Sequence, residues 1–110
     1  MTKNSRRKGA DGEREIAKIL RDHGYDARRG CQFKGGPDSP DVIGLPGIHI
    51  EVKRVESLNI YNAMDQSCCD AGPMEIPVVF HRKNNRGWLV TMGLDDWINL
   101  YAESRCSNAK

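Results

Sequence analysis

Three side chains near the middle of the sequence have types and a spacing that would bring two acids and one base together at one site. Glu51 and Lys53 lie two positions apart in the alternating segment 48–53, so a strand would present both on one face. Asp41 opens the preceding apolar segment, and a Pro46-Gly47 turn separates the two segments. If these strands pair as a hairpin, two carboxylates and an ammonium group come together at one place.

Two neighbouring carboxylates repel each other, which raises the pKa of at least one of them. A divalent cation removes that repulsion, and magnesium prefers one or two carboxylates together with water and substrate phosphate. We therefore expect Asp41, Glu51 and the backbone carbonyl of Val52 to bind Mg²⁺ or Mn²⁺, with Lys53 orienting water or stabilising transition-state charge. An isolated E-x-K pair is also common as a plain salt bridge on an exposed sheet face, and the motif alone leaves that alternative open.

Hydrophobic periodicity and turn residues predict the elements that must position these side chains. We predict a helix at 10–23, strands at 25–29, 41–45 and 48–53, a helix at 59–71, strands at 76–81 and 88–92, and a helix at 94–101. In segment 48–53, Ile48, Ile50 and Val52 are expected on one face, and His49, Glu51 and Lys53 on the other. This order predicts an α/β or α+β layered fold with a mixed sheet.

Length and composition predict one soluble, globular domain over residues 1–110. The chain has 38% hydrophobic and 29% charged residues, and no apolar run approaches the length of a membrane span. The polar N-terminus has no apolar core of a signal peptide, so the cytoplasm is the expected location. Residues 1–8 are expected to form a basic arm, and residues 103–110 a frayed tail.

The formal net charge is only +2, which does not by itself predict nucleic-acid binding. The basic residues gather in three clusters, however, and such clusters can contact phosphates. A solvated surface is the alternative for any one cluster. The predicted DNA contacts are Arg6, Arg7, Lys8, Arg28, Arg29, Lys34 and Arg82.

The four cysteines show no CxxC spacing, and the three histidines are scattered along the chain. A structural zinc site usually needs such close pairs, so reduced thiols are the better interpretation. Trp88 and Trp97 are expected to be core or dimer contacts rather than base-stacking platforms.

Pro40-Asp41 followed by Glu51-Val52-Lys53 resembles the signature of the PD-(D/E)XK nuclease superfamily, and segment 7–15 resembles the start of archaeal-type Holliday junction resolvases. Small phage or prophage proteins of that branch are the most similar. The resemblance implies a restriction-endonuclease-like αβββαβ core with a mixed central sheet flanked by helices. It also implies a metal-dependent endonuclease that acts on branched DNA as a homodimer, encoded by a bacterium or a phage. By this resemblance Glu13 is the helix acid, Asp41 and Glu51 are metal ligands, and Lys53 is the catalytic lysine.

Several alternatives stay open. Glu15 competes with Glu13, which could simply stabilise the helix dipole, and Asp38 competes with Asp41. Gln66, Tyr61 and Ser39 resemble auxiliary positions of the superfamily. A nicking or end-processing nuclease of phage replication or repair would share the site, whereas a DNA-binding module without catalysis, or one stabilised by zinc, would share only the binding.

Overall fold

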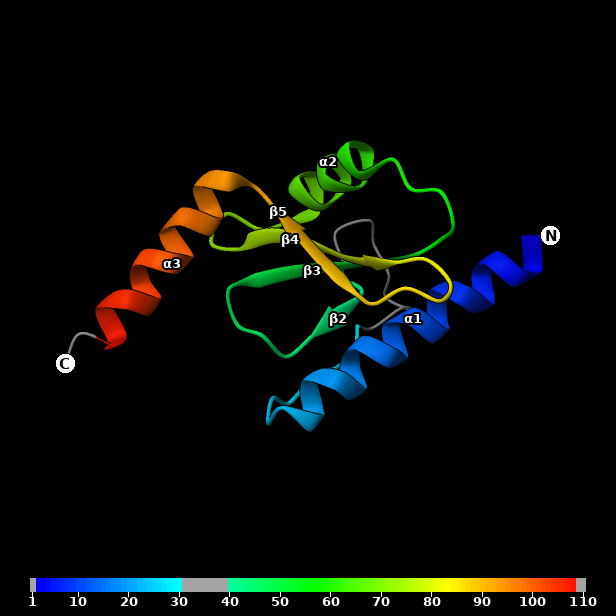
Figure 1. Cartoon of the computed structure of the whole chain (residues 1–110), viewed down its shortest axis with the longest axis horizontal. Helices are drawn as coiled ribbons and strands as arrows, with labels where there is room; N and C mark the ends of the chain where they lie inside the picture. Colours follow the sequence, from blue (N-terminus) through cyan, green and yellow to red (C-terminus); the bar gives the residue numbers. More distant parts are fainter. Residues whose placement is uncertain (1, 31–39, 109–110) are drawn as a thin grey trace.

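The computed structural model describes residues 2–30 and 40–108, and the side chains of residues 9–30 and 40–106. Three helices and five strands follow one another as αβββαββα (Figure 1). Their bounds are α1 Thr2–Asp22, β1 Arg28–Arg29, β2 Val42–Ile43, β3 Ile48–Arg54, α2 Ile60–Asp70, β4 Ile76–Arg82, β5 Leu89–Met92 and α3 Leu94–Asn108. Most of the predicted loop at 30–40, including Lys34, Asp38 and Ser39, lies outside the described residues.

The five strands form one mixed sheet in the order β1-β2-β3-β4-β5. All neighbouring pairs are antiparallel except β3 and β4, which run parallel with Ile50 opposite Val78 and Lys53 opposite His81. A parallel pair needs a long crossover connection, which α2 provides here. The predicted mixed sheet with flanking helices is therefore confirmed.

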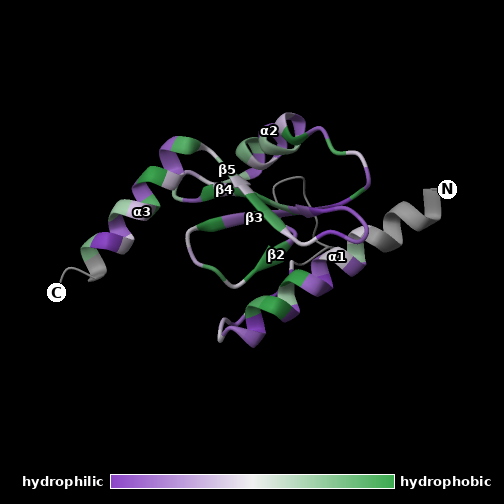
Figure 2. Cartoon of the chain, in the orientation of Figure 1, coloured by the Kyte–Doolittle hydropathy of each residue, from purple (hydrophilic) through white to green (hydrophobic). Residues whose placement is uncertain are grey.

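Helices α1 and α2 lie on opposite sides of the sheet (Figure 1). On the α1 side, Ile16 and Ala17 pack with Ile50, Val52 and other apolar strand residues to form the core. On the α2 side, the buried Ser67 donates a 3.1 Å hydrogen bond to the carbonyl oxygen of Val78. Figure 2 shows the apolar residues of α1 along the part of the helix that passes under the sheet.

The burial of β3 differs from its prediction. Its alternating sequence predicts one buried and one exposed face, yet His49 is 0% and Glu51 2% exposed. The reason is that β3 is a central strand with α2 covering its second face, so both faces are removed from water.

The helix ends also differ from their predictions. Helix α1 begins at Thr2, not at residue 10, so the expected basic arm is helical. Helix α3 continues to Asn108, beyond the residue at which a frayed tail was expected to begin. Strands β1 and β2 contain two residues each and are shorter than predicted. Helix α2 agrees closely with its prediction, because Asn59 Oδ1 caps it by accepting a 3.1 Å hydrogen bond from the amide of Asn62.

Helix α3 projects away from the sheet and makes few contacts with the other elements (Figure 1). Cys68, Cys69 and Cys106 are exposed and form no disulfide, as expected for reduced thiols. Within residues 2–30 and 40–108, no helix is both long and apolar enough to cross a membrane.

Candidate functional site

A pocket of about 290 Å³ gathers all four predicted catalytic residues. Glu13 comes from α1, Asp41 immediately precedes β2, and Glu51 and Lys53 come from β3. The remaining lining residues are Gly9, Val52, Arg54, Val55 and Gln66. Residues 38 positions apart in the sequence thus share one small cavity between α1, the sheet and α2.

The pairing of β2 with β3 explains why Asp41 reaches Glu51. Val42 lies opposite Ile50, and the amide of Asp41 donates a 2.9 Å hydrogen bond to the carbonyl oxygen of Ile50. The amide of Val52 in turn donates a 2.8 Å hydrogen bond to Asp41 Oδ2. The Asp41 carboxylate is therefore held against the part of β3 from which Glu51 emerges.

Burial raises the pKa of Asp41 from 3.8 to about 6, and the neighbouring Glu51 carboxylate adds to this increase. The Val52 amide and the Lys53 ammonium act in the opposite direction but do not outweigh burial. Burial is also the main cause of the raised pKa of Glu13, to which the Asp41 carboxylate contributes. Three carboxyl groups thus share a partly dehydrated pocket, an arrangement that a bound cation would stabilise.

The donors in this pocket fit a hard divalent cation. Asp41 and Glu51 offer carboxylate oxygens, and Val52, whose backbone carbonyl is the third predicted ligand, also lines the pocket. Magnesium and manganese prefer such oxygen ligands to nitrogen or sulfur. Glu51, whose charge raises the pKa of Asp41, is the residue that would share the ion with it.

Lys53 contacts the pocket wall formed by α2. Its Nζ donates a 3.0 Å hydrogen bond to Oε1 of Gln66, which also lines the pocket. Tyr61, the other helix residue predicted as auxiliary, is 81% exposed and does not line the pocket. Ser39 lies outside the described residues.

The structure separates the two candidate helix acids. Glu13 lines the pocket and accepts a 2.9 Å hydrogen bond from Nε of Arg29. Glu15 points elsewhere, because its oxygens accept from Trp88 Nε1 at 3.1 Å and lie within 3.3–3.4 Å of Arg82 and Arg54 nitrogens. Glu13 therefore lies with Asp41, and Glu15 holds α1 to the far strands.

The predicted DNA contacts lie in different surroundings. Arg29 is paired with Glu13, and Arg82 is paired with Glu15 and stacks 5.6 Å from the Trp88 ring centre. Arg28 is largely exposed, 3.7 Å from Asp26. The side chains of Arg6, Arg7 and Lys8 and the whole of Lys34 lie outside the description.

His49 is a neighbour of the site that the sequence did not single out as part of it. It is fully buried, and its Nε2 lies 3.1 Å from Glu51 Oε2. Among the described residues its Nδ1 has no hydrogen-bond partner, and Glu75 Oε1 lies 3.6 Å from it. His49, Glu51 and Asp70 each have one potential ligand atom within 4.8 Å of the others. The alternation of 48–53 did place His49 on the face of Glu51, but the alternation pointed to an exposed face.

Comparison with known proteins agrees with this architecture. The family model described as archaeal Holliday junction resolvase (Hjc) matches residues 4–67, which are 64 of the 110 residues. Among solved structures, the chain is similar to Hjc, a Holliday junction resolvase from the archaeal hyperthermophile Archaeoglobus fulgidus. The TM-score is 0.57 with 23% sequence identity, over 77% of this chain and 72% of that chain.

A search of curated proteins finds no significant match. The likeness to the solved structure supports the fold, and the family model covers α1, the sheet edge and β3, which carry the four pocket residues. The protein is therefore a member of the archaeal Holliday junction resolvase (Hjc) family, nucleases that act on branched DNA.

Proposed function

We propose that this protein is a Mg²⁺- or Mn²⁺-dependent endonuclease that hydrolyses phosphodiester bonds in branched DNA, with Glu13, Asp41, Glu51 and Lys53 as its catalytic residues. The observation that carries this proposal is the meeting of these four side chains in one pocket. A DNA-binding module without catalysis would have no need to hold three carboxyl groups together against their mutual repulsion.

Asp41, Glu51 and the Val52 carbonyl are the groups that would hold the cation. When bound, a divalent ion polarises the scissile phosphate and lowers the pKa of a coordinated water. The chain's own contribution is to hold Asp41 in place through the Val52 amide and to exclude bulk water from Glu51.

Lys53 supplies the positive charge of the site. Its ammonium group is held by Gln66, so it stays at the pocket wall beside Glu51. There it can orient the attacking water and stabilise negative charge that develops on the phosphate oxygens. Glu13, held by Arg29, is in place to accept a proton or to orient water from the α1 side.

The direct experiment compares cleavage of labelled four-way junctions, linear duplexes and nicked duplexes by wild type and by Asp41→Ala, with and without Mg²⁺. We expect the wild type to cleave junctions most rapidly and only with the cation, and the variant to be inactive. A preference for nicked or linear DNA would favour the nicking or end-processing alternative. Equal activity of the two proteins would contradict the site.

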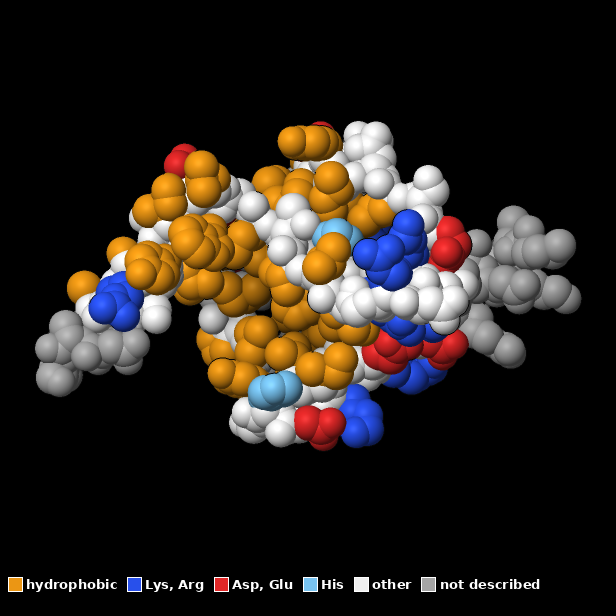
Figure 3. Space-filling view, viewed as in Figure 1, with side chains coloured by type: hydrophobic (Ala, Val, Ile, Leu, Met, Phe, Trp, Pro, Cys, Tyr) orange, Lys and Arg blue, Asp and Glu red, His pale blue; other side chains and the backbone are white. Residues whose placement is uncertain are grey.

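A homodimer is part of the same proposal, because symmetric cleavage of a junction needs two equivalent sites. A surface for a second copy is formed by α3 and β5, where large apolar side chains are exposed; Figure 3 shows them gathered over α3. They are Leu89, Val90, Leu94, Trp97, Ile98, Leu100 and Tyr101, and we call this set the α3 surface. The Trp97 and Tyr101 rings stack with their centroids 5.5 Å apart, and both are about half exposed, so this aromatic pair is open to a partner.

The proposal also includes the domain organisation of the protein and its location in the cell. Residues 1–110 act as a single nuclease domain, and the protein works in the cytoplasm of a bacterium or a phage-infected cell, where branched DNA arises. Gel filtration with light scattering tests the oligomer, and fractionation of the source cell tests the location.

A further inference from the structure

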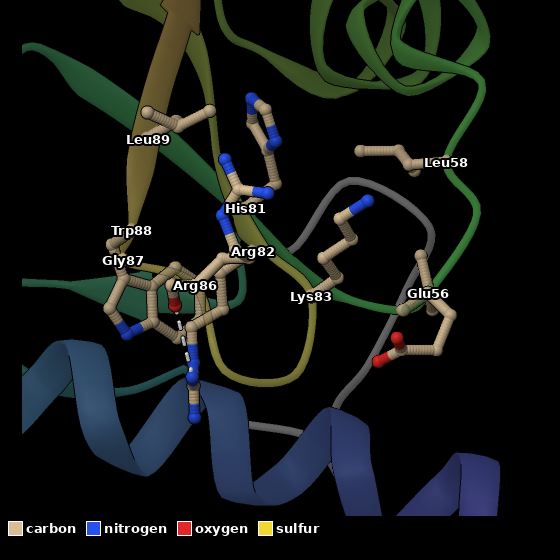
Figure 4. A pocket seen from close by; sticks show the side chains of 10 residues that line it. Glu56, Leu58, His81, Arg82, Lys83, Arg86, Gly87, Trp88 and Leu89 are labelled. Carbon is tan, nitrogen blue, oxygen red and sulfur yellow. Dashed lines mark hydrogen bonds between the residues drawn. The ribbon is translucent and has the colours of Figure 1, made fainter.

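A second cavity, of about 440 Å³, lies between the β3–α2 connection and the β4–β5 hairpin (Figure 4). We call it the hairpin groove. Its lining combines apolar and charged side chains: Val55, Glu56, Leu58, His81, Arg82, Lys83, Arg86, Gly87, Trp88 and Leu89. The groove adjoins the catalytic pocket, since Val55 lines both.

The parallel register explains why the two cavities are neighbours. Lys53 of β3 lies opposite His81 of β4, and Arg54 lies opposite Arg82. The hairpin therefore begins at the same edge of the sheet at which the strand of the catalytic lysine ends. A DNA strand that leaves the pocket along this edge reaches the hairpin groove next.

The positively charged side chains of the groove differ in whether they are free to bind a ligand. Arg82 is turned toward α1, where it pairs with Glu15 and donates to the carbonyl oxygen of Arg86 (Figure 4). Lys83 and Arg86 are exposed, and no carboxylate among the described residues forms an ion pair with either. In Figure 4 the Lys83 side chain projects into the space between the hairpin and Leu58.

The other ionisable groups of the groove are one carboxylate, that of Glu56, and the His81 imidazole, so the lining keeps an excess of positive charge. Glu56 Oε2 accepts a 2.8 Å hydrogen bond from the amide of Asn84 at the hairpin tip. His81 Nε2 lies 2.8 Å from Thr91 Oγ1 in a hydrogen bond, and burial lowers the pKa of its imidazole, which favours the neutral form. Two cationic side chains thus face a partly apolar groove, which suits a sugar–phosphate chain.

We propose that the hairpin groove binds the backbone of the DNA strand adjacent to the cleavage site, through contacts of Lys83 and Arg86 with its phosphates. This inference rests on the proposed nuclease function and assigns the path of its substrate. It also revises the predicted DNA contacts in this region: Lys83 and Arg86 contact DNA, whereas Arg82 is a structural residue.

The test measures binding of a labelled four-way junction without divalent cations, at several salt concentrations, for Lys83→Gln, Arg86→Gln and the double variant. The slope of log K against log salt is negative, and each lost phosphate contact should reduce its magnitude by about 0.9 and weaken binding about eightfold at 0.1 M salt. The charge-matched controls are Lys18→Gln and the pair Lys18→Gln/Arg105→Gln, which lie away from the groove. These controls should bind almost as wild type does.

Two outcomes would overturn the inference. If the hairpin variants have salt slopes as steep as those of the wild type or of the controls, the groove does not contact phosphates. Cleavage separates this failure from failure of the nuclease proposal. If the wild type cuts junctions while the variants bind normally, only the path of the strand is wrong; if the wild type binds but never cuts, the proposed function fails.

A different observation carries a second inference, on His49. Glu51 is 2% exposed, so its carboxylate has lost nearly all contact with water. Because a carboxylate only accepts hydrogen bonds, the 3.1 Å contact means that Nε2 of the buried His49 donates to Glu51 Oε2. The imidazole is itself fully buried, at 0% exposure, so the surrounding side chains restrict its rotation.

We infer that His49 is a positioning residue that fixes the Glu51 carboxylate for cation binding. Outer hydrogen bonds of this kind orient metal-binding carboxylates, and their loss typically lowers metal affinity about 10–100-fold. His49→Gln keeps an N–H donor at similar reach, whereas His49→Asn is too short and His49→Leu has no donor.

Calorimetric titration with Mn²⁺ and thermal unfolding together test this role. We expect Mn²⁺ affinity to fall at least about tenfold in His49→Leu and His49→Asn, and to stay within about threefold of wild type in His49→Gln. Unchanged affinity in the folded Asn or Leu variant, or equal loss in all three, would reject it. A merely structural role would lower melting temperatures without this pattern of affinities.

Discussion

The amide of Val52 donates a 2.8 Å hydrogen bond to Oδ2 of Asp41, where a neighbouring strand would otherwise accept it. The pairing of β2 with β3 extends only to Val42 and Ile50, so the two strands part at this position. The carboxylate of Asp41 fills the opening and satisfies the free amide. A polar group left by the end of a strand pair thus holds a candidate metal ligand beside Glu51.

Asp41→Asn should stabilise the cation-free protein at neutral pH. The pKa of Asp41 is raised from 3.8 to about 6, so the folded protein binds this proton more tightly than the unfolded chain. The ionised carboxylate therefore opposes folding above pH 6, and this penalty disappears as the pH falls to 4. Asparagine keeps an oxygen for the Val52 amide, and the expected gain at pH 7 is about 1–2 kcal/mol. Urea unfolding at pH 7 and pH 4 measures it; the exposed Asp26→Asn should show no such gain.

Divalent cations should reverse that order of stability. At a Mn²⁺ concentration ten times the dissociation constant, binding to the folded protein adds about 1.4 kcal/mol to the unfolding free energy of the wild type. Asp41→Asn should gain much less, because one of its two carboxylates is gone. Thermal unfolding with and without Mn²⁺ is the measurement, and an equal rise in both proteins would place the ion elsewhere.

Lys53→Ala should abolish cleavage while leaving junction binding largely intact. The lysine acts on the reacting phosphate rather than on the DNA arms, so we expect the single-turnover rate to fall at least about 100-fold. Junction affinity should stay within about threefold of wild type, since one cation among many is lost. Binding and cleavage are measured on the same labelled junction. A parallel loss of affinity would mean that Lys53 is mainly a DNA contact.

Substitutions of Glu13 and Glu15 should have different effects, the first on the cleavage rate and the second on stability. Glu13→Gln should reduce the cleavage rate about 100-fold with little change in stability, since Glu13 lines the catalytic pocket. Glu15→Gln should cleave as wild type when folded but lose about 1–3 kcal/mol of stability, because Arg54 and Arg82 lose their shared carboxylate. Cleavage rate constants and urea unfolding midpoints are measured for both variants. A loss of cleavage in Glu15→Gln and a loss of stability in Glu13→Gln would identify Glu15 as the catalytic acid.

Trp97→Asp should dissociate the proposed homodimer, because it places a charge in the centre of the α3 surface. Sedimentation of the wild type should give the dimer mass and that of the variant the monomer mass. Met74→Asp is the control, since Met74 is 88% exposed and lies outside the α3 surface. Dissociation by both substitutions, or by neither, would argue against this surface.

Local patterns predicted the elements that carry the site. The Pro46-Gly47 turn and the alternation of 48–53 were sufficient to bring Asp41, Glu51 and Lys53 together, because they act over a dozen residues of adjacent chain. The predicted start of α2 at residue 59 is one residue early, because Asn59 caps the helix that begins at Ile60. Glu13 lies far away in sequence, and only the resemblance to resolvases pointed to it.

The burial of His49 could not be predicted in the same way. It depends on β4 pairing parallel to β3 and on α2 crossing over that face, both of which involve residues more than ten positions away. Alternation describes the two faces of a strand but not what covers them. The sequence also does not show that Lys83 is free to contact DNA while Arg82 is not. That difference arises because Arg82 pairs with Glu15, which lies 67 positions before Arg82 in the chain.

Gly12 links the packing of α1 against β3 to the position of the Glu13 carboxylate. A β-carbon there would lie 3.2 Å from the β-carbon of Arg54 and 3.3 Å from Cγ1 of Val52, so α1 approaches β3 more closely than a larger residue would allow. Glycine weakens a helix by about 1 kcal/mol relative to alanine, and the chain accepts this loss within α1. The next residue is Glu13, whose carboxylate depends on that close approach to reach Asp41. An added methyl group at this position would have to displace Arg54 or Val52 by a few tenths of an ångström, so Gly12 limits how closely α1 can bring Glu13 to the strand that carries Glu51.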